Sequence, residues 1–155
     1  LEQFGAKLGA DVPFLVQGGT AFAEGIGEKL KPVTVEFPKA VLVATPHCAV
    51  PTKDAYAGVK PSGNVRWEQF RSAWNGTLSF EFYNKFEESV FPKYPMIQDL
   101  KNKLENLGAF KTLMSGSGAS VFSLFDSEEN AKKALAIIEP TVRFSRITQF
   151  KEKLI

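Results

Sequence analysis

Residues 113–122, Leu-Met-Ser-Gly-Ser-Gly-Ala-Ser-Val-Phe, place a glycine- and serine-rich turn between two apolar runs. Glycine adopts backbone angles that other residues avoid, and small side chains let backbone amides approach a ligand or another segment closely. The apolar runs predict two strands, over 110–114 and 119–125. In the second strand, alternate side chains should face opposite sides of the sheet. The stretch therefore predicts a β-hairpin.

The segments on both sides of this hairpin extend the pattern. Residues 41–44 form a continuous apolar run, typical of a central strand buried on both faces. Apolar side chains recur at helical spacing over 96–107 and over 128–138, and residues 142–147 alternate as a last strand. The order of elements predicts an α+β fold, a ferredoxin-like four-stranded antiparallel sheet with helices on one face.

Three further regions are expected to form strands or helices. Residues 19–24 and 28–33 flank a glycine-containing connection and predict a second hairpin, and residues 1–8 have the pattern of a helix that ends at a glycine. Short helices are expected over 53–59, 65–74 and 79–90, with Thr52 as a possible cap of the first.

The composition excludes several classes of protein. Apolar residues make up 44% of the 155 residues, which supplies a core, and 19 basic and 17 acidic side chains leave a net charge of +2. This near-equality of basic and acidic side chains argues against a surface dedicated to nucleic-acid binding. The apolar runs are far shorter than the roughly 18 residues that span a bilayer. One cysteine cannot form an internal disulfide. We therefore expect a cytoplasmic protein without nucleic-acid or membrane partners.

Asp11 is a candidate catalytic carboxylate. It precedes the hydrophobic run Val-Pro-Phe-Leu-Val, which should hold it near the protein interior. Partial burial tunes a carboxyl group for proton transfer to or from a hydroxyl. The alternative, more common for the residue type alone, is a turn aspartate that hydrogen-bonds its own backbone.

The turn of the first hairpin is a candidate phosphate site, formed by Ser115, Gly116, Ser117 and Gly118. It matches neither the Walker loop, since no Gly-Lys-Ser/Thr follows, nor the dinucleotide-binding fingerprint, because a strand comes next. Phosphate binding here would use a concave group of backbone amides. An ordinary tight turn that requires glycine is an equal alternative.

Thr52 and Tyr56 are four residues apart and would share one face of a helix. The threonine hydroxyl could contact a sugar or phosphate, and the tyrosine ring could stack on a base. The alternative is a helix cap and a core aromatic. His47 and Cys48 are adjacent and are taken as structural, because no cluster in the sequence has metal-ligand spacing.

Several segments together resemble a known family. They are Leu8-Gly9-Ala10-Asp11-Val12-Pro13-Phe14, Gly18-Gly19-Thr20-Ala21, Gly25-Ile26-Gly27-Glu28, Pro51-Thr52 with Tyr56, and Met114-Ser115-Gly116-Ser117-Gly118-Ala119. In this order they resemble the 4-diphosphocytidyl-2-C-methyl-D-erythritol kinases of the GHMP kinase superfamily, over nearly the whole chain. The serine–glycine loop is shared across the superfamily, whereas the two blocks nearest the start are specific to these kinases.

The resemblance implies transfer of the ATP γ-phosphate, with Mg²⁺, to the 2-hydroxyl of 4-diphosphocytidyl-2-C-methyl-D-erythritol, a step of non-mevalonate isoprenoid biosynthesis. It implies that Asp11 is the catalytic carboxylate. Tyr56 would stack on the cytosine, Thr52 would be a nearby polar contact, and the loop of residues 115–118 would line the phosphate site.

The chain departs from the family pattern in one respect. The family's lysine-bearing N-terminal segment and its glycine-rich ATP loop do not occur in this sequence. We therefore expect residues 1–38 to be the tail of an ATP-binding domain and residues 39–155 to be the C-terminal domain, and we expect this chain to be inactive alone and to lack most Mg²⁺ ligands. The alternatives are another GHMP small-molecule kinase and a non-catalytic ferredoxin-like ligand-binding domain.

Overall fold

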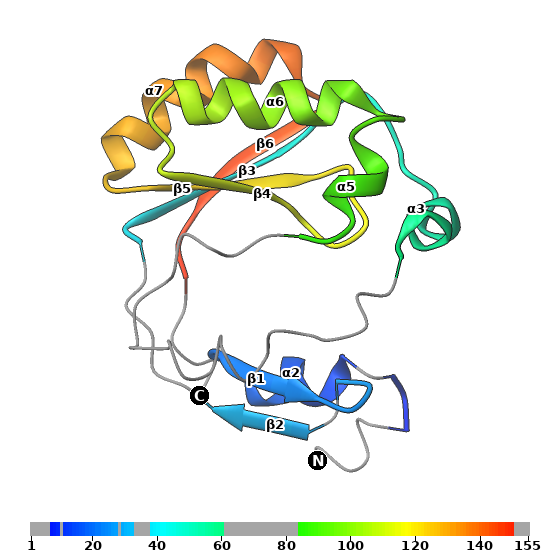
Figure 1. The fold of residues 1–155 in the computed structure, drawn as a ribbon. Coiled ribbons are helices and arrows are strands. Elements are labelled where there is room, and N and C mark those ends of the chain that lie inside the picture. Colours follow the sequence, from blue (N-terminus) through cyan, green and yellow to red (C-terminus); the bar gives the residue numbers. More distant parts are fainter. Residues whose placement is uncertain (1–6, 10, 28, 33–37, 61–83, 151–155) are drawn as a thin grey trace. The chain divides into compact units, whose positions relative to one another are not determined.

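The computed structural model describes residues 7–9, 11–27, 29–32, 38–60 and 84–150 of the chain. The described residues belong to two compact units. Of the described residues, those from 7 to 32 lie in the first unit together with Phe150, and residues 38–60 and 84–149 lie in the second. Figure 1 shows the elements of both, and each unit is described by itself.

The first unit contains α2 (Val12–Gln17), β1 (Ala21–Glu24) and β2 (Lys29–Pro32). The two strands pair antiparallel, with Ala21 opposite Pro32 and Glu24 opposite Lys29, so the predicted hairpin is confirmed. Helix α2 was not predicted. It has a proline in its first turn, where the missing N–H costs no hydrogen bond. Of the helix expected over residues 1–8, only residues 7 and 8 are described, and they form a turn.

The second unit is built on a four-stranded antiparallel sheet. Its strands are β3 (Ala40–Thr45), β4 (Lys111–Met114), β5 (Val121–Phe125) and β6 (Phe144–Thr148), in the spatial order β4-β5-β3-β6. Each neighbouring pair runs antiparallel. Taken in chain order, this is the strand arrangement of the ferredoxin-like fold, so the predicted fold class is confirmed.

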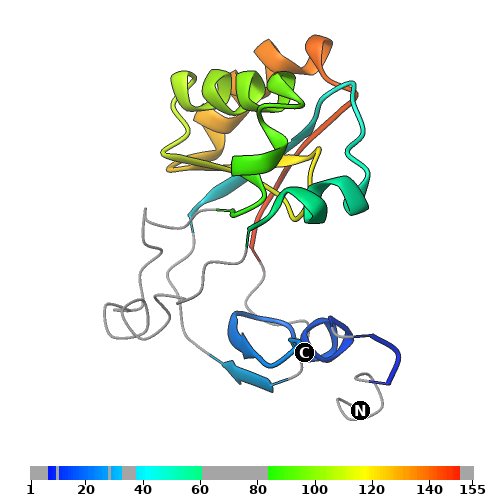
Figure 2. The same ribbon diagram turned by 45° about the vertical axis from the view of Figure 1, so that its right-hand side comes forward.

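Two long helices, α6 (Pro95–Asn106) and α7 (Glu128–Ile138), cover one face of this sheet (Figures 1 and 2). Helix α6 is followed by Gly108, whose φ of +95° is favourable for glycine and whose N–H donates to the Glu105 carbonyl. Helix α7 is capped by Ser127, whose hydroxyl accepts from the Asn130 amide at 3.2 Å. A short 3₁₀ turn, η1 (Glu139–Thr141), follows α7. Both predicted helices are confirmed.

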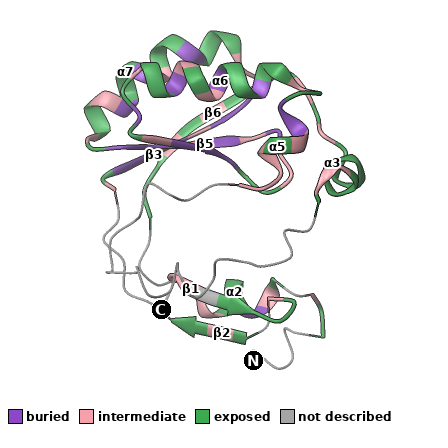
Figure 3. Ribbon diagram, viewed as in Figure 1, coloured by how far each residue is buried: buried purple, intermediate pink, exposed green. Residues whose placement is uncertain are grey.

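The core lies between the sheet and these two helices (Figure 3). Phe125 and Leu42 are its largest side chains from the strands, and Ile97, Leu104 and Ile138 are the largest from the helices; all are fully buried. Alternation along β5 explains the pattern, because Val121 and Phe125 face the helices while Phe122 and Leu124 face the other side. The strands are apolar on both faces, because Val41, Leu113 and Leu124 are buried too but lie outside this helix-facing cluster.

Two short helices complete the second unit, α3 (Thr52–Gly58) and α5 (Glu87–Val90). Pro51 occupies the N-cap of α3, and Thr52 is its first helical residue, so the interpretation of Thr52 as a cap was wrong. The helix predicted over 65–74, and most of that predicted over 79–90, lie outside the described residues. Within the described part of the chain, each helix is too short or too polar to cross a lipid bilayer.

Candidate functional site

The turn between β4 and β5 has a conformation that requires its glycines. Ser115 N–H donates to the Ser120 carbonyl at 2.8 Å, and Gly118 N–H donates to the Ser115 carbonyl at 3.0 Å. Gly116 has a φ of +55° at the first central position, as in a type II′ turn. Gly118 has a φ of +89°, and a Cβ there would lie 2.8 Å from the Met114 sulfur. Replacement of either glycine would strain the loop.

The loop exposes hydrogen-bond donors. Among the interactions of the described residues, the amides of Gly116 and Ser117 have no hydrogen-bond partner, and Ser117 also carries a hydroxyl. Adjacent unpaired amides of this kind suit an anionic oxygen. The loop of residues 115–118 therefore has the donor chemistry that the sequence analysis anticipated for a phosphate site.

Helix α3 lies beside this loop. The Thr52 hydroxyl is 3.4 Å from the Ser117 hydroxyl, so the start of α3 contacts the loop directly. Tyr56 lies one turn further along the same helix, and its ring meets Phe86 edge to face, with centroids 4.8 Å apart. Tyr56 is 65% exposed, so its interpretation as a core aromatic was wrong. The second unit thus brings three predicted elements together, namely Thr52, Tyr56 and the loop.

Two residues that the sequence analysis missed contact the same loop. Asn84 Nδ2 donates to the carbonyls of Met114 and Gly116, both at 2.7 Å. Glu87 Oε1 accepts from the Met114 amide at 2.8 Å. About thirty residues separate Asn84 and Glu87 from the loop, so neither belongs to a sequence motif that includes the loop. No local sequence signal could therefore have identified the two residues.

Asp11 lies in the first unit, at the N-cap position of α2. Its side chain is exposed, which contradicts the expected partial burial. The local reason is that the apolar run after it forms a short helix with Pro13 as its buried residue, leaving Asp11 outside. Its carboxylate makes no capping hydrogen bond, so the alternative of a turn aspartate bonded to its own backbone is not seen either.

His47 and Cys48 follow the end of β3, and neither contributes to a metal site in the part of the chain described here. That part contains no group of three or more His, Cys, Asp or Glu side chains able to bind a metal ion. Burial raises the pKa of the Cys48 thiol, against the opposing effect of the nearby Arg143 charge. A raised pKa reduces the thiolate fraction, so Cys48 is a poor nucleophile at neutral pH.

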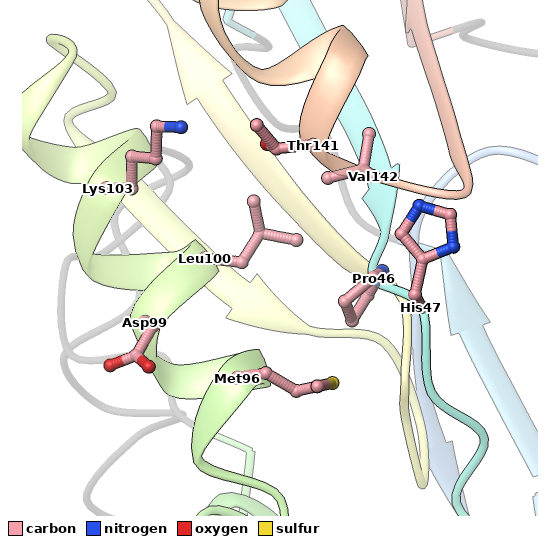
Figure 4. Close-up of a pocket in the computed structure, with 8 residues that line it drawn as sticks. All are labelled: Pro46, His47, Met96, Asp99, Leu100, Lys103, Thr141 and Val142. Carbon is pink, nitrogen blue, oxygen red and sulfur yellow. The ribbon is translucent and has the colours of Figure 1, made fainter.

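A pocket of about 330 Å³ lies elsewhere on the second unit (Figure 4). Helix α6 lines one side of it, and the residues after β3 together with η1 line the other; the lining side chains are Pro46, His47, Met96, Asp99, Leu100, Lys103, Thr141 and Val142. None of the predicted site residues is among them. The pocket is therefore distinct from the loop of residues 115–118.

Comparison with known proteins gives consistent matches. Residues 68–140 match the family described as GHMP kinases C terminal. The 4-diphosphocytidyl-2-C-methyl-D-erythritol kinase of Bacteroides fragilis is 40% identical over 139 residues, covering 86% of this chain and 49% of the relative. The enzyme of the same name from Thermodesulfovibrio yellowstonii is 32% identical over 151 residues, covering 90% of this chain and 53% of the relative.

A solved structure agrees with these relatives. The crystal structure of a 4-(cytidine 5'-diphospho)-2C-methyl-D-erythritol kinase superposes with a TM-score of 0.75 at 30% identity, covering 96% of this chain and 56% of that one. The chain spans about half the length of the curated relatives that it matches.

Proposed function

We propose that this chain is the C-terminal part of a GHMP kinase, and that its gene product, meaning the whole protein with the ATP-binding part that the family resemblance implies, phosphorylates the 2-hydroxyl of 4-diphosphocytidyl-2-C-methyl-D-erythritol with ATP. The observation that carries the proposal is the agreement of sequence relatives and a solved structure on one kinase. The reaction would provide a precursor of isoprenoids by the non-mevalonate route, in the cytoplasm, with a small molecule as partner.

The described residues fit part of the expected ligand set. The unpaired amides of Gly116 and Ser117, with the hydroxyls of Ser117 and Thr52, are donors suited to phosphate oxygens. Among the described residues, no group of three or more His, Cys, Asp or Glu side chains could hold a metal ion. No step of the proposed reaction is therefore assigned to a metal ligand of this chain.

In the proposed reaction, Asp11 accepts the proton of the substrate hydroxyl. The substrate hydroxyl oxygen forms a bond to the γ-phosphorus as the bond to the β-phosphate oxygen breaks, and the hydroxyl proton passes to the Asp11 carboxylate. The Asp11 side chain is exposed and makes no capping hydrogen bond, so no bond to α2 holds its carboxylate. The loop of residues 115–118 would orient phosphate oxygens, because positioning supplies most of the catalysis in phosphoryl transfer.

A substrate panel tests the proposal. The gene product, given ATP and Mg²⁺, should phosphorylate the cytidine-diphosphate-linked methylerythritol with a kcat/KM at least about a hundredfold above those for homoserine and mevalonate. A site that hydrogen-bonds the polar groups of its own substrate discriminates strongly against alcohols that lack them. Formation of ADP and of the phosphorylated product would be measured together. Preference for either other alcohol would instead indicate a different GHMP kinase, and absence of turnover with all three would indicate a ligand-binding role.

Tyr56 should contribute to binding of the cytosine. Replacing Tyr56 with alanine should raise KM for the cytidine-linked substrate by roughly fivefold to a hundredfold, because stacking of a base on an aromatic ring is worth about 1–3 kcal/mol. Tyr56→Phe retains the ring and its edge contact with Phe86, so its KM should stay close to that of the parent. KM for ATP serves as the internal control. An equal rise in both KM values would contradict the assignment.

A further inference from the structure

Two side chains, instead of another strand, bind the outer edge of β4 at Met114. β4 is at the end of the sheet, with β5 on its inner side. The hydrogen bond from Ser115 N–H to Ser120, together with the pairing of Met114 opposite Val121, leaves the N–H and C=O of Met114 directed away from β5. An edge strand ordinarily leaves such groups to water or to another chain.

Both Met114 groups have side-chain partners. Glu87 Oε1 accepts from the amide at 2.8 Å, and Asn84 Nδ2 donates to the carbonyl at 2.7 Å. Met114 is 1% exposed, so the two bonds satisfy backbone groups that water reaches poorly. The other Glu87 oxygen pairs with Lys101 of α6 at 2.6 Å, and the Glu87 side chain is only 13% exposed. The carboxylate is thereby anchored to a long helix of the core.

Asn84 extends this arrangement into the loop. The same Nδ2 group that binds the Met114 carbonyl also donates to the Gly116 carbonyl at 2.7 Å, while Oδ1 accepts from the Phe86 amide at 3.0 Å. A carboxamide can donate two hydrogen bonds and accept two, so one side chain satisfies all three. Gly116 is the positive-φ residue of the turn. Asn84 therefore contacts the loop at the point that sets its conformation.

The segment containing Asn84 also supports α3. Phe86 carries the edge contact to Tyr56. Ser89 donates to the Ala55 carbonyl at 3.4 Å, and a Cβ on Gly58 would lie 2.5 Å from the Ser89 Cβ, so α3 packs closely against α5. One short segment thus joins the loop of residues 115–118 to the helix that carries Thr52 and Tyr56.

We propose that Asn84 is a positioning residue that sets the conformation of the loop of residues 115–118 through the Met114 and Gly116 carbonyls. Its effect on turnover rests on the proposed function, whereas its effect on the loop does not. In this proposal the Asn84 side chain acts through the backbone of the loop and does not contact the substrate.

Two substitutions separate the donor and acceptor roles of Asn84. Asn84→Asp retains an oxygen for the Phe86 amide but removes both donors and directs negative charge at two carbonyls. In the gene product it should lower kcat by roughly tenfold to a hundredfold, because small displacements of positioning groups are costly, with KM for the alcohol substrate nearly unchanged. Asn84→Ala also removes the acceptor for Phe86 and should raise that KM as well.

Hydrogen exchange reports on the loop without reference to catalysis. In Asn84→Asp, the amides of Ser115 and Gly118 should exchange roughly tenfold faster, the equivalent of about 1.4 kcal/mol, while those of Leu42 and Leu104 keep their parental rates. The matched control is Asn130→Asp on α7, which loses an amide donor to Asp126 at the opposite end of β5 from the loop. It should leave both the loop exchange and kcat unchanged.

The outcomes distinguish this inference from the proposed function. Unchanged loop exchange in both Asn84 variants would overturn the inference, as would equal acceleration throughout the second unit, which would indicate general destabilisation. Faster exchange confined to the loop would support it even if the parent protein phosphorylated none of the alcohols in the panel. That last result would count against the proposed function alone.

Discussion

Replacing Asp11 with asparagine should lower kcat by about 10²–10⁴-fold, the range typical of a lost acid–base group, while KM for the cytidine-linked alcohol stays within a few-fold. Asparagine has nearly the same shape but cannot accept the hydroxyl proton. In the structure the Asp11 side chain is exposed and makes no capping bond, and the helix bond from Leu15 N–H uses the Asp11 backbone carbonyl. The substitution should therefore leave α2 intact.

Steady-state kinetics of the gene product and its melting temperature would be measured together. Asp99→Asn, an exposed aspartate on α6, is the matched control and should change neither value. If Asp11→Asn retained full kcat, the proposed catalytic role of Asp11 would be wrong. If the variant had both a lower kcat and a lower melting temperature, the Asp11 side chain would have a structural role that is not seen in the present structure.

Replacing Phe125 with alanine should lower the free energy of unfolding of the second unit by about 3–5 kcal/mol. Phe125 is fully buried at the end of β5 and is the largest such side chain among the described residues. Truncation removes its contacts with the core and leaves a cavity that rigid neighbours cannot fill. Since whole domains are stable by only about 5–15 kcal/mol, this loss is a large share of the total.

Chemical denaturation followed by circular dichroism would measure the effect. Phe144→Ala provides the matched control, because Phe144 lies in β6 of the same sheet but is 50% exposed, and its truncation should cost much less. Equal destabilisation by the two substitutions would show that the core is not where the present structure has it.

Local patterns were sufficient for most of the second unit. The apolar spacing over 96–107 and the glycine after it correspond to α6 and Gly108, and the run at 41–44 corresponds to β3. These features could be read from the sequence because a helix cap or a buried strand depends on side chains a few residues apart. Helix α2 was missed, since Val-Pro-Phe-Leu-Val-Gln is too short for periodicity to distinguish a helix from a strand.

The candidate site could be predicted only in part. Thr52, Tyr56 and the loop were selected from the sequence, but their proximity depends on packing between segments that are distant in the chain. The Thr52 and Ser117 hydroxyls, for example, are 65 residues apart in sequence and 3.4 Å apart in space. The alternative interpretations, Thr52 as a cap and Tyr56 as a core residue, were wrong, because Pro51 occupies the N-cap of α3 and Tyr56 faces solvent. The substrate contacts expected of both residues stay predictions.

The sequence by itself determined the ferredoxin-like order of strands and helices, the glycine turn between β4 and β5, and the resemblance to one kinase family, since each of these is encoded in residues that are near neighbours. Only the tertiary structure decided which groups complete the loop. The bonds of the Met114 carbonyl to Asn84 and of the Met114 amide to Glu87 exist because β4 is an edge strand whose outward backbone groups need partners, and which strand lies at an edge is settled when the whole sheet assembles.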